Sequence, residues 1–217
     1  EVPQFPAGTP WDIILNYEGV SLEQLVAARG EVIDIDLMDL IDDNNTSYIM
    51  ELKKTKSVIC YFSAGSREDW RKDAMDFTAA DIGKEMRDPN DPLEDWPGEN
   101  WIDVKSTNVR NIMKARIEKA AKYGCSAIDP DNVDGYDSNH QDGYTYDKSV
   151  YAEYVNYLAG IARDNNLAIG LKNALDIIPD VQQNIQFAVN EQCHEKKECQ
   201  IYESMTKADK AVFNIEY

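Results

Sequence analysis

The residues best placed to do chemistry are three aspartates that follow a short apolar run near the middle of the chain, Asp129, Asp131 and Asp134. Pro130 cannot donate to the hydrogen-bond ladder of a central strand, so a strand is expected to end there. Carboxylates at the end of a buried strand are costly unless they are partnered or used, and neighbouring carboxylates raise one another's pKa. The alternative is a solvated, Asp-rich turn. A second acid in similar surroundings, Glu191, favours chemistry.

Two carboxylates facing one cavity, with Lys172, Tyr61 and Asn173 nearby, suit glycoside hydrolysis. One acid attacks the anomeric carbon or activates water, and the other protonates the leaving oxygen, which requires a raised pKa. We predict that Asp131 and Glu191 form this pair and that Lys172 keeps a nearby carboxylate ionised. The alternatives are an exposed acid beside a disulfide turn for Glu191 and a solvated side chain for Lys172.

Other chemistries lack their motifs. The chain contains no GxSxG, HExxH, CxxC or phosphate-binding loop. The run from Asp129 to His140 has the look of a calcium loop, but Val133 and His140 occupy the fifth and twelfth positions, where an EF-hand needs oxygen ligands. We therefore predict neither a metal nor a cofactor.

Charge is the most pronounced global feature. The 217 residues include 40 Asp and Glu against 22 Lys and Arg, a formal net charge of −18. Such a surface argues against nucleic acid and anionic membranes as partners, and no apolar run approaches the ~18 residues of a membrane span. The acidity either keeps an extracellular protein soluble or attracts a cationic substrate. We expect a monomer.

The cysteines favour an oxidising, extracellular compartment. Cys193 and Cys199 are close enough in sequence to close a small disulfide loop. Cys60 and Cys125 lie in apolar, strand-like runs, where buried free thiols are expected. The stretch 44–47 contains two overlapping N-glycosylation sequons, which matter in a eukaryotic secretory route.

Apolar strands alternate with amphipathic helices along the chain, the pattern of βα units around a parallel sheet. Polar residues recur where the strands end, and the carboxyl ends of barrel strands converge on one mouth. The fold class is therefore α/β, a (β/α)8 TIM-type barrel that forms one domain over residues 1–217. Only seven strands are recognised, so the eighth is missing or modified. The seven are expected at 11–15, 32–36, 57–62, 127–131, 167–171, 185–189 and 210–216.

A long excursion interrupts this rhythm between Arg67 and Lys105. It is rich in Asp, Pro, Gly and Trp and is expected to consist of turns. The run 101–104 is an alternative extra strand, but its place in the excursion favours a loop. A loop of this length in a compact domain is usually functional. Trp96 and Trp101 are candidate sugar-stacking platforms, and at least one of them is expected to cover the core instead.

The chain closely resembles glycoside hydrolase family 114, the endo-α-1,4-polygalactosaminidases with related spherulin-like proteins. The resemblance runs in order over essentially the whole chain. It is carried by Val58–Ser66 with Glu68 and Arg71, Trp96–Asp103, Asp129–Tyr136, Leu171–Ala174, Asn190–Cys193 and Glu216–Tyr217.

This resemblance implies a secreted TIM-barrel enzyme that cuts α-1,4-linked galactosamine in microbial exopolysaccharide. It implies a catalytic Asp at the fourth strand and a catalytic Glu, Glu191, at the sixth. Asp131 is our choice for the Asp, with Asp129 as its neighbour and Asp134 as an alternative, and by analogy the mechanism is retaining. The partner is then a cationic polysaccharide. The residues expected to bind it are Asp36, Tyr61, Asp129, Asp134, Tyr136, Lys172, Asn173 and Glu216.

The competing hypothesis is a carbohydrate-binding or cell-wall protein on the same barrel with little or no turnover, because a fold does not fix a function. A third reading is a barrel that acts on another α-linked sugar.

Overall fold

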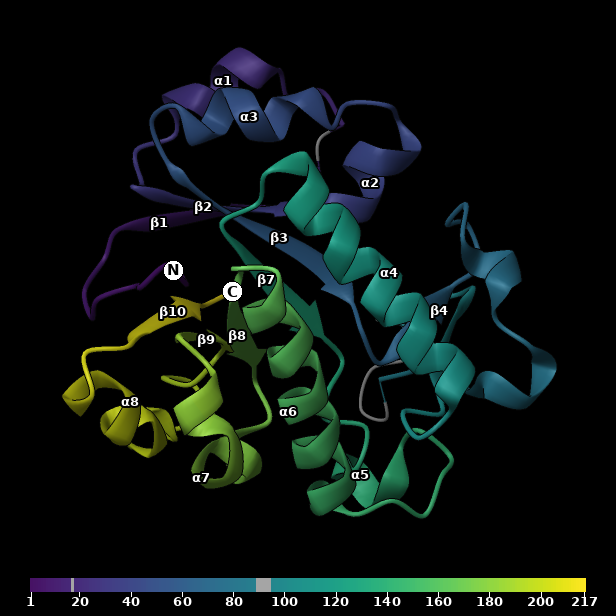
Figure 1. Cartoon of the computed structure of the whole chain (residues 1–217). Helices are drawn as coiled ribbons and strands as arrows, with labels where there is room; N and C mark the ends of the chain where they lie inside the picture. Colours follow the sequence, from purple (N-terminus) through teal and green to yellow (C-terminus); the bar gives the residue numbers. More distant parts are fainter. Residues whose placement is uncertain (17, 89–94) are drawn as a thin grey trace.

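The computed structural model describes residues 1–16, 18–88 and 95–217. Its centre is a sheet of seven parallel strands in the order β1-β2-β3-β7-β8-β9-β10, curved into a nearly closed barrel (Figure 1). All seven predicted strands are confirmed. They are β1 (Trp11–Ile14), β2 (Val32–Asp36), β3 (Ser57–Ser63), β7 (Ala127–Asp131), β8 (Ala168–Lys172), β9 (Phe187–Glu191) and β10 (Ala211–Ile215).

The described residues contain no eighth parallel strand, and β1 and β10 are the two edges of the sheet. The N-terminal segment lies beside β10 instead, where the backbone N–H of Ala211 donates to the carbonyl of Phe5 at 2.9 Å. Aromatic rings fill the interior between the two edges. The ring of Trp11 stacks on that of Phe213 with centroids 4.9 Å apart, and Phe5 packs on Phe187 at 5.0 Å. The barrel is thus completed by ring packing and not by strand pairing.

Helices cover the outside of the barrel (Figure 1). In α4 (Thr107–Tyr123) the apolar residues recur at helical spacing and face the sheet, Ser106 caps the N-terminus, and Gly124 ends the helix at φ 97°. The other helices are α1 (Leu22–Ala27), α2 (Leu37–Asp42), α3 (Ser47–Lys53), α5 (Asp137–His140), α6 (Lys148–Asp164), α7 (Ile178–Val181) and α8 (Glu203–Lys207). The helix expected at 176–183 is divided between α7 and two 3-10 turns that flank it, Leu175–Ile177 and Gln182–Asn184. Among the described residues, no helix combines the length and apolarity that crossing a bilayer requires.

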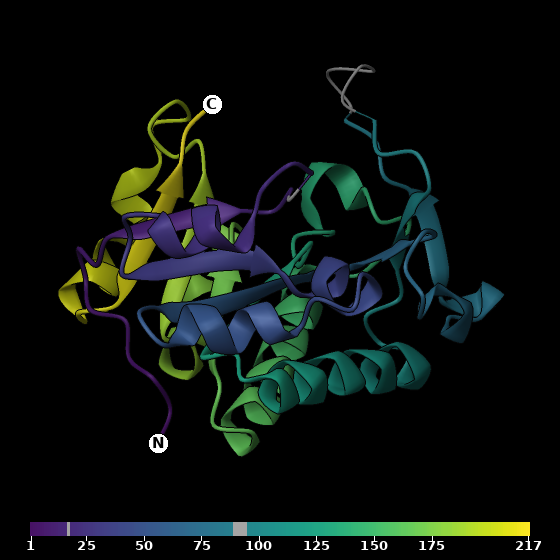
Figure 2. The same ribbon diagram turned by 90° about the horizontal axis from the view of Figure 1, so that it is seen from above.

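The excursion is more regular than expected. It contains a three-stranded antiparallel sheet of β4 (Ser66–Glu68), β6 (Glu99–Ile102) and β5 (Ile82–Glu85), at the side of the barrel to which β3 points (Figure 2). The prediction that Trp101 lies in a loop is therefore wrong, because Trp101 is a buried residue of β6. Buried Arg116 of α4 joins the excursion to the barrel, since it donates to both carboxylate oxygens of Asp73 and to the carbonyl of Ser63.

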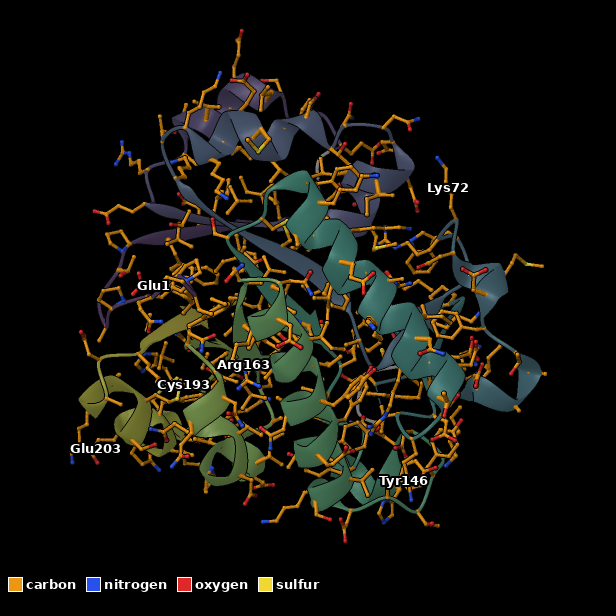
Figure 3. The ribbon with its side chains drawn as sticks, viewed as in Figure 1. Glu1, Lys72, Tyr146, Arg163, Cys193 and Glu203 are labelled. Atoms are coloured by element: carbon orange, nitrogen blue, oxygen red, sulfur yellow. A yellow bond between two sulfur atoms is a disulfide. The ribbon has the colours of Figure 1, made fainter. Side chains whose placement is uncertain are left out.

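All four cysteines form disulfides. The Cys193–Cys199 bond is confirmed, and Cys193 lies on the side of the molecule opposite Lys72 of the excursion (Figure 3). The prediction of free thiols at Cys60 and Cys125 is wrong, because these two residues form a second disulfide across 65 residues of sequence. The disulfide links Cys60 of β3 to Cys125, which lies two residues before the start of β7. Both disulfides fit an oxidising compartment.

Candidate active site

Three charged residues of the site end three adjacent strands. β8 lies between β7 and β9 in the sheet, so Lys172 lies between Asp131 and Glu191. All three strands are parallel, and Lys172 pairs with Val189, two residues before Glu191. Side chains two residues apart point to the same face of a strand, so Lys172 and Glu191 share a face of the sheet. The order of the strands therefore brings together two acids that are sixty residues apart in sequence and sets a cation between them.

Lys172 contacts both acids. Its Nζ is 3.4 Å from Oδ2 of Asp131 and 3.1 Å from Oε1 of Glu191. Those two carboxylate oxygens can be no further apart than the sum of these distances, about 6.5 Å. The Asp131 side chain is 17 % exposed and that of Glu191 30 % exposed, so both reach solvent, whereas the Lys172 side chain is 6 % exposed. Asp131, Glu191 and Lys172 therefore lie together at the mouth of the barrel, as the sequence predicts.

Asp131 is held from several directions. The hydroxyl of Tyr61 donates to Oδ2 at 2.7 Å, and the backbone N–H of Asn132 lies 2.7 Å from Oδ1. The carbonyl of Asp131 accepts from the backbone N–H groups of Ala64 and Gly65. A Cβ on Gly65 would lie 1.5 Å from the carbonyl oxygen of Asn132, so only glycine permits this close approach. Burial, followed by the charge of Asp131, raises the pKa of Tyr61, which therefore remains a hydrogen-bond donor.

Asn173 clamps Glu191 at two points. Its side-chain nitrogen donates to Oε1 at 3.0 Å, and its side-chain oxygen accepts from the backbone N–H of Glu191 at 2.9 Å. The hydroxyl of Tyr217 donates to Oε2 of Glu191 at 2.6 Å. Burial alone would raise the pKa of Glu191, but Lys172, Tyr217 and Asn173 together outweigh it and lower that pKa. Glu191 is therefore ionised in the free site.

The backbone turns left-handed directly after each of the three charged residues. Asn132 follows Asp131 at φ 61°, Asn173 follows Lys172 at φ 47°, and Gln192 follows Glu191 at φ 64°. The left-handed region is unfavourable for most residues other than glycine and is best tolerated by Asn and Asp. Each strand thus ends abruptly at its charged residue, which keeps that side chain at the mouth.

Lys172 is the centre of the local charge. Burial by itself would lower the pKa of Lys172, but Asp131, Asp129 and Glu191 outweigh burial and raise it. Lys172 therefore remains an ammonium group at every pH at which the protein is folded and the carboxylates are ionised. Its Nζ also lies 5.8 Å from the centroid of the Tyr61 ring.

The other predicted binding residues take different positions. Asp36 is 4 % exposed, accepts from Arg71 at 3.0 Å and caps α2 through the N–H of Asp39. Asp129 is fully buried below the mouth. Glu216 is exposed and accepts from the backbone N–H of His194 at 3.0 Å, so it braces the turn of the Cys193–Cys199 disulfide.

The loop after β7 carries the remaining two. Asp134 is half-buried, and burial, followed by the charges of Asp131 and Asp137, raises its pKa to about 7. The ring of half-buried Tyr136 packs on Tyr151 with centroids 5.5 Å apart. Among the described residues the Tyr136 hydroxyl has no hydrogen-bond partner.

Two acids near the site are absent from the sequence-based prediction. Asp34 lies in the middle of β2 and is fully buried. Its flanking residues Ile33 and Ile35 could have identified it, because they indicate a buried strand, and a buried acid needs a partner or a function. Glu99 of β6 accepts from Ser66 at 2.6 Å, and burial raises the pKa of Glu99 to about 7.

Glu99 is connected to the loop of Asp131 by hydrogen bonds. Asn132 donates through its side chain to Ser63 at 2.8 Å, Ser63 and Ser66 share a hydrogen bond, and Ser66 donates to Glu99. The excursion therefore contributes to the position of the residue that follows Asp131.

One cluster of metal-ligating side chains occurs among the described residues, Cys193, His194 and Cys199. The two sulfur atoms are bonded to each other in a disulfide and are therefore not available as thiolate ligands. The cluster does not fit a metal site.

Comparisons with known proteins show the family and the fold. The model of glycoside-hydrolase family GH114 matches residues 1–217. The structure of Aspergillus fumigatus Ega3 in complex with galactosamine is similar to this chain, with 41% identity and a TM-score of 0.82, over 99% of this chain and 79% of that one. The glycoside hydrolase domain of PelA from Pseudomonas aeruginosa has 12% identity and a TM-score of 0.69 over 98% and 84% of the two chains, a likeness of fold alone. No curated protein matches the chain.

Proposed function

The chain belongs to glycoside-hydrolase family GH114, and from that premise we propose that it is an endo-acting hydrolase of α-1,4-linked galactosamine in a cationic microbial exopolysaccharide. The proposal takes residues 1–217 as a single, monomeric and secreted barrel domain. The observation that carries it is the Lys172 ammonium held between the carboxylates of Asp131 and Glu191 at the mouth of the barrel. The likeness to Ega3, whose structure holds galactosamine, supports the choice of sugar.

In this proposal Asp131 is the nucleophile. Its carboxylate attacks the anomeric carbon and forms a glycosyl ester, while Glu191 protonates the departing glycosidic oxygen. Glu191 then removes a proton from the water that hydrolyses the ester. The hydrogen bonds from Tyr61 and from the N–H of Asn132 hold the Asp131 carboxylate in position for both steps.

Glu191 must gain a proton before it can act as an acid. In the free site Lys172, Tyr217 and Asn173 keep its pKa lowered against the effect of burial. A sugar ring that takes the place of the Tyr217 hydroxyl and separates Glu191 from Lys172 removes two of these interactions. Burial then dominates and raises the pKa of Glu191. In this proposal substrate binding causes Glu191 to take up the proton that it then donates to the leaving oxygen.

The spacing of the two acids supports retention of configuration. Carboxyl groups about 5–5.5 Å apart are typical of retaining glycosidases, and about 6.5–9.5 Å of inverting ones, which need room for a water. Asp131 Oδ2 and Glu191 Oε1 are at most about 6.5 Å apart, so the spacing of this oxygen pair does not exceed the lower end of the inverting range. The α-anomer is therefore the expected first product.

The charge of the chain suits an aminosugar polymer. Unacetylated galactosamine carries an ammonium group, and a formal net charge of −18 attracts such a chain over long range. Asp134 is the residue proposed to receive an ammonium group, and its half-buried position near Asp131 supports this role. Exposed Trp96, at 44 % exposure, is a candidate stacking surface for a sugar ring.

The test is the release of reducing ends from partly deacetylated galactosaminogalactan, with mass analysis of the fragments. We expect Asp131→Asn and Glu191→Gln each to lower kcat by about 100- to 10,000-fold. Asp147→Asn is the matched control, because it also removes one carboxylate but preserves the N-cap of α6. Wild-type rates in either of the first two variants would remove that residue from the mechanism.

Azide separates the two roles. On an aryl α-galactosaminide, whose phenolate leaves without an acid, azide should rescue Glu191→Ala and give the α-glycosyl azide, because azide attacks the covalent intermediate from the face that water uses. It should rescue Asp131→Ala and give the β-glycosyl azide. The reverse pattern would exchange the roles, and cleavage of another α-linked polysaccharide in preference would reassign the substrate.

A further inference from the structure

Two aspartates lie inside the barrel directly beneath the mouth. Asp34 is on β2 and Asp129 on β7, the two strands that flank β3. Both side chains are 0 % exposed. Neither has a role in the reaction proposed above, because no substrate atom reaches a fully buried group.

No donor in the described part of the chain serves these carboxyl groups. All four oxygens, Oδ1 and Oδ2 of each residue, lack a hydrogen bond from any N–H or hydroxyl group. The two carboxyl groups lie close enough for each to affect the pKa of the other. Two ionised carboxylates buried together without a donor would repel strongly, whereas a single proton would let one group donate to the other.

We propose that Asp34 and Asp129 share one proton, with Asp34 as the acid that donates to the Asp129 carboxylate, and that this pair is the permanent buried counter-charge of Lys172. Its catalytic consequence rests on the roles proposed for Asp131 and Glu191, whereas the shared proton itself does not.

The surroundings decide which of the two residues carries the proton. Burial raises the pKa of both. For Asp34 the charge and the hydrogen bond of Asp129 add to burial, and Lys172 opposes them only in part. For Asp129 the hydrogen bond from Asp34 and the charge of Lys172 both oppose burial, while Asp131 and Glu191 reinforce it. The negative charge is therefore favoured on Asp129, next to the ammonium group.

The proposed reaction explains why Lys172 needs a counter-charge, here called the anchor, that does not change. Of the three carboxylates that act on Lys172, Asp131 loses its charge when it becomes a glycosyl ester, and Glu191 loses its charge when it holds the proton. Both also face the sugar, which competes with Lys172 for them. Asp129 is the one that solvent does not reach, since it is 0 % exposed. It keeps the ammonium group in place while the other two change their charge, so Asp34 and Asp129 are positioning residues.

Infrared spectroscopy tests the proton directly. A protonated carboxyl group has a C=O stretch that a carboxylate lacks. At a pH well above 7, Glu99 and Asp134, whose pKa values are about 7, are ionised. We expect the wild-type protein to retain a buried C=O band under these conditions, Asp34→Asn to lose it, and the control Asp147→Asn to keep it. A wild-type spectrum without the band, or a band that survives in Asp34→Asn, would overturn the shared proton.

Kinetics test the anchor. The amide of Asp34→Asn has the shape and the donor of a protonated acid, so this variant should keep kcat within about threefold and the wild-type pH profile of kcat/KM. Asp34→Leu leaves the Asp129 carboxylate without its donor and should lower kcat at least about tenfold and displace that profile. Equal losses in the two variants, or no loss in Asp34→Leu, would overturn the positioning role.

The two experiments remain independent. The infrared comparison needs only the wild type and two conservative variants, so it stands even if Asp34→Leu does not fold. Inactivity of the wild type on galactosamine polymers would refute the proposed function and leave the infrared result unchanged.

Discussion

Lys172→Met removes the ammonium group that Asp131 and Glu191 share. Removal of one partner from a buried ion pair leaves the other charge uncompensated and costs roughly 3–5 kcal/mol. Lys172 is 5 % exposed, but the side chains of Asp131 and Glu191 are 17 % and 30 % exposed, so water recovers part of this cost. We therefore expect the free energy of unfolding to fall by about 3 kcal/mol at pH 8, the lower end of that range.

The dependence on pH identifies the cause. In the wild type burial would raise the pKa of Glu191, but Lys172 leads the groups that lower it. A carboxyl group with a lowered pKa stabilises the folded state above its unfolded pKa of about 4.3, and this stabilisation is lost as the pH falls through the folded pKa. In the variant only Tyr217 and Asn173 oppose burial, so the folded-state pKa of Glu191 is higher than in the wild type and Glu191 contributes less stability at pH 8. The difference in stability between the two proteins should therefore narrow as the pH falls from 8 through the two folded-state pKa values.

The assay is urea unfolding of both proteins at a series of pH values. Lys54→Met is the matched control, because the ion pair of Lys54 with Glu51 is exposed and such pairs contribute little at any pH. A loss in Lys172→Met that does not change with pH, or that is as small as the control's, would refute the argument that Lys172 sets the ionisation of this site.

Three further predictions concern the scaffold and the substrate. Gly65→Ala should lower kcat about 100-fold, because its Cβ would displace Asn132 beside Asp131. The control Gly160→Ala in α6, whose Cβ meets nothing within 4 Å, should stabilise the protein by about 0.5–1 kcal/mol. Equal effects of the two substitutions on kcat would contradict the close approach at Gly65. Replacement of Cys60 and Cys125 by Ala should cost about 4 kcal/mol in urea unfolding, since the bond closes a loop of 65 residues; an unchanged midpoint would mean that the disulfide contributes nothing. With rising salt, kcat/KM should fall for a deacetylated galactosamine polymer and stay constant for the fully acetylated one; parallel curves would exclude electrostatic attraction of the substrate.

The parallel barrel was predictable because its strands are apolar runs that end in a polar residue. Each run is long enough to be recognised on its own, and βα alternation then requires a parallel sheet. The same reasoning predicted that Lys172 lies near Asp131 and Glu191, because the ends of parallel barrel strands converge; its position between them follows from the strand order of the structure. The pKa of Glu191 did not follow, because it depends on contacts with Asn173 and Tyr217 that no spacing rule describes.

Features that depend on distant pairing were missed. β4 to β6 are only three or four residues long and lie among turn-forming residues, so each is unremarkable until it is paired. Cys60 and Cys125 look like core thiols because their neighbours are apolar, and only the adjacency of β3 and β7 brings their sulfur atoms together. The sequence favours Asp36 over Asp34, because Asp36 stands at the end of the same strand.

The left-handed residues Asn132, Asn173 and Gln192 have a consequence for engineering. Backbone conformations of this kind cost of order 1–3 kcal/mol each in residues other than glycine. A search for heat-resistant variants would find easy gains at this rim, with Gln192→Gly among the first. Such gains would come from freeing the chain at the points that aim Glu191 and its neighbours, so they would trade turnover for robustness. Stabilising substitutions are better placed in the outer helices α4 and α6.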